Sequence, residues 1–139
     1  MSTAQTWLIF GGTFNILFST LVAYALFWVR SRDLQKPAPH YGLIAHTSSI
    51  TNGLMLIALS VVIDHTNFTA NINAGLAIAE FLGTLLSNGR NLVLWSENLE
   101  DGFAQVSNTR RRIRALGNII HLVVWSAVFY GVTRTALGF

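Results

Sequence analysis

The 139-residue sequence contains no cysteine, and its charged residues are few. The lack of cysteine excludes a disulfide framework, a thiolate metal site and a catalytic thiol. Charged residues make up 11% of the chain, whereas a typical soluble domain has about 25%. Hydrophobic residues make up 52%, so the composition favours a protein that lies in a membrane.

Familiar catalytic motifs are missing as well. The sequence has no HExxH, no GxSxG and no phosphate-binding loop. Its basic residues form clusters between apolar runs, not a long basic face with interleaved aromatic residues, so we expect no nucleic-acid partner. Because there is no internal repeat and no linker, we predict one transmembrane domain over residues 1–139.

Four apolar segments are long enough to cross a bilayer, for which a helix needs about 20 mostly apolar residues. They cover residues 7–29, 42–63, 72–95 and 115–137. The third segment becomes polar after Leu86, and Pro37 and Pro39 separate the first segment from the second. We therefore predict an all-α fold, an integral membrane four-helix bundle whose successive helices are antiparallel neighbours.

The basic residues indicate how these helices are oriented. They gather in the first and third connections, and the second connection, around Asp64, contains neither Arg nor Lys. By the positive-inside rule, the first and third connections face the cytoplasm and both termini face outward. The first charged residue, Arg30, follows the first apolar segment, so we expect a spanning helix there rather than a cleaved signal. The expected location is an integral, multi-pass position in a membrane, the inner membrane if the cell is bacterial.

The run Arg110–Arg114 falls in the third predicted connection. Basic clusters next to membrane helices usually report topology and contact with lipid headgroups, so the lipid bilayer is the first partner we expect. The alternative interpretation is that these arginines anchor the carboxylates of a cofactor.

Polar side chains form one stripe along the third segment. At about 100° per residue they fall within an arc of roughly 100°. The stripe consists of Glu80, Thr84, Ser87, Asn88, Asn91 and Trp95. Polar residues inside a membrane tend to face the protein interior and to mark function. Hydrogen bonding between helices is one interpretation, but a glutamate with two asparagines favours a cavity or a binding site.

Two histidines lie inside the apolar segments. His46 shares a helical face with Ser49 and Gly53, whose small side chains leave room for a flat group or a closely packed helix. Asn52 lies about 120° away around the same helix. His121 lies in the fourth segment. Each imidazole is either a structural group with satisfied hydrogen bonds or a ligand for iron.

The first and fourth segments also carry polar or aromatic faces, which we expect to turn inward. The face on the first segment consists of Thr13, Thr20 and Tyr24. The face on the fourth segment consists of Asn118, His121 and Trp125.

The stretch Ala45–Ala58 reads Ala-His, five residues, Asn-Gly and then an apolar run with a methionine. It resembles the second helix of styrene oxide isomerases, which are small four-helix membrane proteins. It is also similar to hydroxylaminobenzene mutases, which are close to this chain in length. The specific resemblance covers about 14 residues, and the four-helix organisation extends it more loosely to the whole chain.

The resemblance implies a haem b cofactor. The matching histidine of styrene oxide isomerases ligates the haem iron, so His46 becomes the axial ligand and the metal-binding residue. Asn52 becomes a polar group near the substrate. Asn91 matches an asparagine that the family has on its third helix, and Trp95 stands where the family has a tyrosine. Under the resemblance, Asn52, Asn91, Trp95 and Glu80 are the expected catalytic residues.

The implied reaction is the redox-neutral isomerisation of a small hydrophobic aromatic substrate. Ferric haem b acts as a Lewis acid on an epoxide, which becomes a carbonyl compound. Glu80 is expected to stabilise a developing cation or to bond to His121. A homo-oligomer is also expected, because four short helices leave little interior space for a haem.

Three alternatives stay open at this point. A hydroxylaminobenzene mutase-type rearrangement would keep the redox-neutral chemistry with a different substrate. If His46 and His121 ligated the same haem, the chain would be a b-type cytochrome that carries electrons. Without haem it would be a small transporter or structural subunit, with the polar stripe as a pathway or as a contact between helices.

Overall fold

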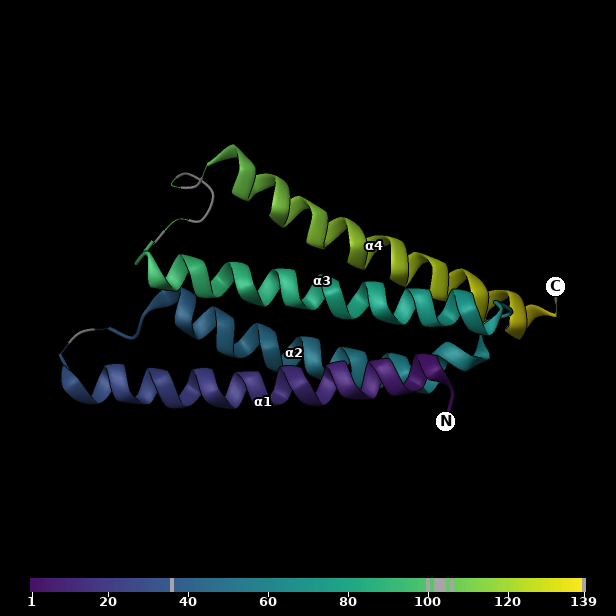
Figure 1. The fold of residues 1–139 in the computed structure, drawn as a ribbon, viewed down its shortest axis with the longest axis horizontal. Coiled ribbons are helices and arrows are strands. Elements are labelled where there is room, and N and C mark those ends of the chain that lie inside the picture. Colours follow the sequence, from purple (N-terminus) through teal and green to yellow (C-terminus); the bar gives the residue numbers. More distant parts are fainter. Residues whose placement is uncertain (36, 100, 102–104, 106, 139) are drawn as a thin grey trace.

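The structure, a computed structural model, describes residues 1–35, 37–99, 101, 105 and 107–138 (Figure 1). These ranges contain no strand. The helices are α1 (Thr3–Arg32), α2 (His40–Val62), the single 3-10 turn η1 (Ile63–His65), α3 (Ala70–Ser96) and α4 (Asn108–Leu137). The predicted all-α fold class with four long helices is confirmed.

α1 and α3 extend beyond both ends of the apolar segments that predicted them, and α2 and α4 begin earlier than predicted, because polar residues continue the same helical backbone. Ser2 starts α1 by accepting a hydrogen bond from the backbone N–H of Gln5, whose side chain bonds back to the N–H of Ser2. α4 begins at Asn108 rather than near residue 115. The arginine-rich run therefore lies in the first turns of α4, not in a connection as predicted. Arginine favours helix strongly, although it is not apolar.

The four long helices run antiparallel in chain order (Figure 1). α3 packs against α1, α2 and α4, whereas α4 packs mainly against α3 and diverges from it toward the N-terminal end of α4 (Figure 1). Both termini and the α2–α3 connection lie at one end of the bundle, and the other two connections lie at the opposite end. α3 is thus the helix whose side chains meet those of all the others.

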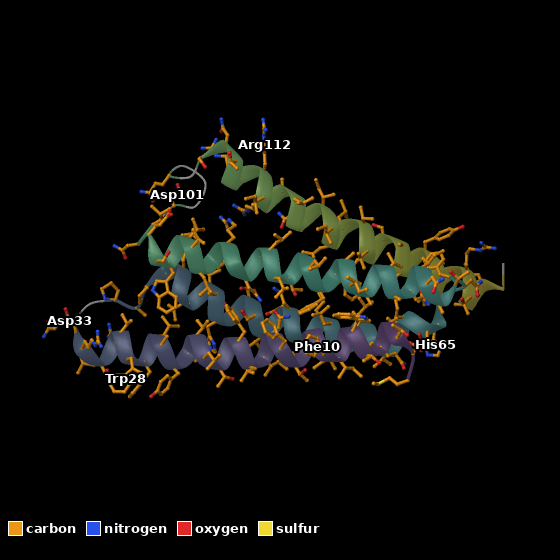
Figure 2. The ribbon with its side chains drawn as sticks, viewed as in Figure 1. Phe10, Trp28, Asp33, His65, Asp101 and Arg112 are labelled. Carbon is orange, nitrogen blue, oxygen red and sulfur yellow. The ribbon has the colours of Figure 1, made fainter. Side chains whose placement is uncertain are left out.

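The basic residues of the first and third connections lie at one end of the bundle. Arg30 and Arg32 occupy the last turn of α1, and the run Arg110–Arg114 occupies the first turns of α4. Asp33, Asp101 and Arg112 are seen at this end in Figure 2, and His65 at the other. This is the arrangement on which the predicted orientation depends.

α1 and α2 approach each other closely enough for their backbones to touch. A Cβ atom on Gly12 would lie 2.9 Å from the carbonyl oxygen of Gly53, and a Cβ on Gly53 would lie 2.9 Å from that of Gly12. Gly11 faces α3, where a Cβ would lie 2.7 Å from the ring of Phe81. The glycines of these helices are therefore packing positions, as the small-residue pattern indicated.

Three helical stretches are long and apolar enough to cross a membrane: Thr3–Arg32, His40–His65 and Arg111–Leu137. Their outward faces carry large apolar side chains such as Phe27, Leu122 and Phe129, which are more than half exposed. α3 has 27 residues but is less apolar, because it carries the polar stripe. Most of that stripe is buried against other helices, which removes it from contact with lipid.

Candidate functional site

A set of amide side chains joins α1, α2 and α3 in the middle of the bundle. Asn88 on α3 donates a short hydrogen bond from Nδ2 to Oδ1 of Asn15 on α1. Asn52 on α2 donates from Nδ2 to Oδ1 of Asn88 over 3.1 Å. Asn15 donates to the carbonyl oxygen of Gly11 at 2.8 Å and to the hydroxyl of Thr84 at 3.1 Å. We call Asn15, Asn52, Thr84 and Asn88 the amide network.

The amide network continues toward the basic end of the bundle. The Asn91 amide donates to the Ser48 hydroxyl at 3.2 Å, and that hydroxyl donates to Asn88 at 3.5 Å. Arg90 donates from Nη1 to Oδ1 of Asn91 at 3.2 Å. The structure thus brings together Asn52 and Asn91, two of the residues predicted to be catalytic. Their amide groups bond to protein partners, which is how buried amides are normally stabilised.

Glu80 is the centre of a second polar cluster, between α3 and α4. Its side chain is fully buried. Oε1 accepts hydrogen bonds from Nδ1 of His121 at 2.8 Å and from Nε1 of Trp125 at 3.0 Å. The predicted bond between Glu80 and His121 is confirmed. Oε2 is buried and has no hydrogen-bond partner in the part of the chain that the structure describes.

His46 is held by α1 through one residue, Ser19. Its Nδ1 lies 2.7 Å from the Ser19 hydroxyl oxygen and 3.1 Å from the Ser19 carbonyl oxygen. The Ser19 hydroxyl donates its hydrogen to the carbonyl oxygen of His46 at 2.8 Å. The Ser19 carbonyl oxygen can only accept a hydrogen bond, so this contact favours the tautomer that carries the ring proton on Nδ1. A neutral imidazole protonated at Nδ1 presents its lone pair at Nε2.

This arrangement fits the donor that a haem iron requires. Ligating histidines usually donate their other ring N–H to a carbonyl or carboxylate, which fixes the tautomer and the ring orientation. Among the described residues, no three or more His, Asp or Glu side chains come together to hold a metal ion. A haem needs only one or two ligands from the protein, since its macrocycle provides the others. The chemistry of His46 therefore suits haem better than a bare metal ion.

The predicted cofactor contacts at Ser49 and Gly53 lie in the α1–α2 interface. Ser49 is fully buried and donates to the carbonyl oxygen of Ala45 at 2.6 Å. Gly53 packs on the backbone of α1. His46 is half-buried at the edge of this interface. His46 does not line any of the three clefts described below.

The two histidines within the apolar segments, His46 and His121, have separate surroundings. His46 bonds to α1, whereas His121 bonds to Glu80 of α3 and packs against Gly83, where a Cβ atom would lie 3.2 Å from its ring. This geometry does not support an iron ligated by both imidazoles. The fold therefore adds no support for the b-type cytochrome alternative or for a cofactor-binding role of His121.

Trp95, also predicted to be catalytic, packs among apolar side chains near the basic end. A Cβ atom on Gly42 would lie 3.0 Å from its ring, and Val22, Leu26 and Ala45 form the adjacent core cluster. Trp95 thus lies beside the turn of α2 that precedes His46. A role in contact with substrate stays a prediction.

The predicted inward face of α1 is wrong. Thr13 and Thr20 are exposed and donate to carbonyl oxygens of their own helix, at Ile9 and Ile16. Tyr24 is 62% exposed. The residues that face inward are Asn15 and Ser19, which the sequence analysis missed. The signal was present, because Leu8, Gly11, Gly12, Asn15 and Ser19 follow each other at helical spacing.

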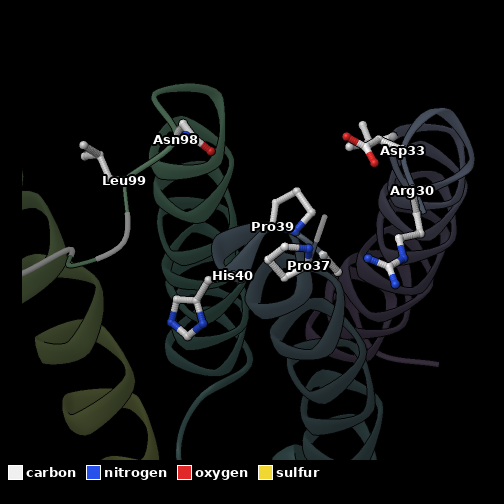
Figure 3. A pocket seen from close by; sticks show the side chains of 9 residues that line it. Arg30, Asp33, Pro37, Pro39, His40, Asn98 and Leu99 are labelled. Atoms are coloured by element: carbon white, nitrogen blue, oxygen red, sulfur yellow. The ribbon is translucent and has the colours of Figure 1, made fainter. Parts of the chain in front are cut away.

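The largest described cleft, of about 650 Å³, is separate from these polar groups. It lies at the basic end, where Arg30, Asp33 and His40 face Asn98 and Leu99 (Figure 3). Two smaller clefts, of about 450 and 230 Å³, lie along α3 and α4 and share Leu86, Arg90 and Ile113. The smaller of these two is lined by Ser48 and Asn91, through which hydrogen bonds lead to Asn88 of the amide network.

In comparisons with known proteins, no protein-family model, no curated protein and no solved structure matches this chain.

Proposed function

We propose that this chain is a membrane-embedded, redox-neutral isomerase of a small hydrophobic aromatic substrate, with haem b ligated by His46. The resemblance at Ala45–Ala58 motivates the proposal. The observation that carries it is the pair of contacts from Ser19, which leave the Nε2 lone pair of His46 available for iron.

The chain's own residues have definite tasks under this proposal. Ser19 fixes the orientation of the imidazole ring. Its carbonyl oxygen accepts a hydrogen bond from the Nδ1–H group, which makes Nε2 a stronger ligand for iron. The apolar surroundings exclude water, which would otherwise add to an opened epoxide. When bound, the haem supplies a ferric Lewis acid for the substrate oxygen without net redox change. Catalytic roles for Asn52, Asn91, Trp95 and Glu80 stay predictions.

The proposed site includes a second copy of the chain, which would complete it. Leu43 and Ile50 lie one turn before and after His46 on α2 and are 45% and 37% exposed. Together with the imidazole they form an apolar strip at the edge of the α1–α2 interface. We propose that a neighbouring chain covers the cofactor at this strip, in a homo-oligomer.

The membrane placement proposed here has α1, α2 and α4 in contact with lipid and α3 between them. The end that carries Arg30, Arg32 and the run Arg110–Arg114 faces the cytoplasm. In a bacterial cell this is the inner membrane.

The absorbance spectrum of protein purified from haem-replete cells tests the proposal. We expect a haem spectrum that changes when cyanide is added, because one coordination position is open. His46→Ala should lose the haem, and His121→Ala is the matched control that should retain it. Styrene oxide and phenylhydroxylamine, assayed side by side, distinguish an epoxide isomerase from a mutase.

Three results would overturn the proposal. The first is a colourless wild-type protein from those cells, which would favour a transporter or structural subunit. The second is a low-spin haem that is indifferent to cyanide and to both substrates, which would favour an electron carrier. The third is a His46→Ala protein that keeps its haem and its activity.

A further inference from the structure

α4 diverges from α3 toward the basic end of the bundle (Figure 1). Two clefts are lined mainly by residues of these two helices. They are the clefts of about 450 and 230 Å³ that share Leu86, Arg90 and Ile113. We call the two together the α3–α4 groove. His46 does not line the groove. The inference below rests on the membrane placement proposed above but not on the isomerase chemistry.

The two parts of the α3–α4 groove differ in the polarity of the residues that line them. The larger part is apolar apart from Arg90 and is bordered by Leu85, Gly89, Val93 and Leu94. The smaller part is polar and contains Ser87, Asn91 and Asn118 together with two arginines, Arg90 and Arg114. The described residues that line either part include no Asp or Glu. The groove therefore suits a ligand with an anionic head and an apolar tail.

The position of the arginines along the helices matches the level of lipid headgroups. Arg90 lies about 10 Å from the middle of α3 along the helix axis, at about 1.5 Å per residue. The hydrocarbon core of a bilayer extends about 15 Å from its midplane. A long arginine side chain spans the difference and places its guanidinium at the interface. Arg114, in the second turn of α4, borders the same cavity.

We propose that the α3–α4 groove binds an anionic phospholipid. The guanidinium groups of Arg90 and Arg114 hold the phosphate, with Asn118 and Ser87 as additional hydrogen-bonding groups at its edge. One acyl chain lies along the apolar part of the groove. The lipid fills the space between the two helices at the end where α4 diverges from α3.

Native mass spectrometry of the purified full chain tests this proposal with two probes, phosphatidylglycerol and phosphatidylcholine with identical acyl chains. We expect the protein to retain phosphatidylglycerol preferentially. Arg90→Gln and Arg114→Gln should each weaken its retention about fivefold, the effect of one arginine near a headgroup. Arg134→Gln removes the same charge from the exposed opposite end of α4 and should change nothing.

A second pair of variants tests the tail. A Cβ atom on Gly89 or on Gly75 would meet no atom within 4 Å, and both glycines are exposed on α3. Only Gly89 borders the α3–α4 groove. Gly89→Leu should therefore lower phosphatidylglycerol retention by filling the groove, and Gly75→Leu should not. Both changes favour helix, so the variants are expected to fold.

Three outcomes would overturn the proposal. The first is equal retention of the two lipids by the wild-type protein. The second is a loss in Arg134→Gln or Gly75→Leu as large as in its groove counterpart. The third is full displacement of phosphatidylglycerol by inorganic phosphate at the lipid's own concentration, which would show a free-anion site to which the tail adds nothing.

Discussion

Ser19 and His46 bond to each other in both directions across the α1–α2 interface. The serine hydroxyl donates to the His46 backbone carbonyl at 2.8 Å, and both serine oxygens lie within hydrogen-bonding distance of the imidazole Nδ1. One residue thus fixes the orientation of the ring, the position of its proton and the contact between two helices. Removal of the Ser19 hydroxyl should therefore have two separate effects, one on the ligation of haem by His46 and one on the packing of α1 against α2.

Ser19→Ala should weaken haem binding by about tenfold, the lower end of the loss seen when the hydrogen-bonding partner of a metal-ligating group is removed. The serine carbonyl remains, so binding should not be abolished. Titration of haem into the apoprotein, followed by absorbance, measures this change. Thr20→Ala removes an outward-facing hydroxyl next along α1 and should bind haem as the wild-type protein does. Unchanged haem affinity in Ser19→Ala would contradict the positioning role of Ser19.

Asn15→Ala should destabilise the bundle by about 1–2 kcal/mol, the magnitude of interhelical hydrogen bonds in model membrane peptides. The change leaves the Asn88 amide and the Thr84 hydroxyl without their partner on α1. Thermal unfolding in detergent measures the loss. Thr13→Ala is the control, since this exposed hydroxyl bonds only within its own helix. Equal melting temperatures for the two variants would show that the amide network adds no stability.

Glu80→Leu should destabilise the protein by about 1–3 kcal/mol, because Nδ1 of His121 and Nε1 of Trp125 lose their common acceptor. Glu80→Gln keeps an acceptor oxygen of the same shape and should recover part of that loss. The midpoint of unfolding by denaturant, compared among the three proteins, gives the order. A Gln variant no more stable than the Leu variant would mean that the negative charge, and not the hydrogen bonds, stabilises the α3–α4 contact.

Gly53→Ala and Gly75→Ala should change stability in opposite directions. A Cβ atom at position 53 would lie 2.9 Å from the backbone oxygen of Gly12, so α1 and α2 must separate, with a loss of about 1–3 kcal/mol. At position 75 a Cβ meets nothing within 4 Å, and alanine favours helix by up to about 1 kcal/mol over glycine. Thermal unfolding of both variants checks the signs. A gain in stability for Gly53→Ala would contradict the close contact of the two helices.

The candidate site was predictable in its parts but not in its arrangement. Helical spacing predicted the polar stripe of α3. A bond from Glu80 to His121 was one of the two roles expected for Glu80, and the structure shows it. Asn15 and Ser19 were missed, and Thr13, Thr20 and Tyr24 were chosen in their place. A threonine hydroxyl can bond to a carbonyl of its own helix and so face lipid, whereas an asparagine amide has more groups to satisfy and needs partners on other helices. That difference favours Asn15 as the inward residue.

The sequence by itself determined the number of long helices, their approximate limits and the clustering of basic residues at one end, because hydrophobic length and charge are properties of each segment alone. Only the tertiary structure decided how each helix is rotated about its axis. Spacing gives the angles between residues on one helix, but not which of its faces meets a neighbour. The partners of Asn15, Ser19 and Glu80 depend on that rotation, which packing between helices sets.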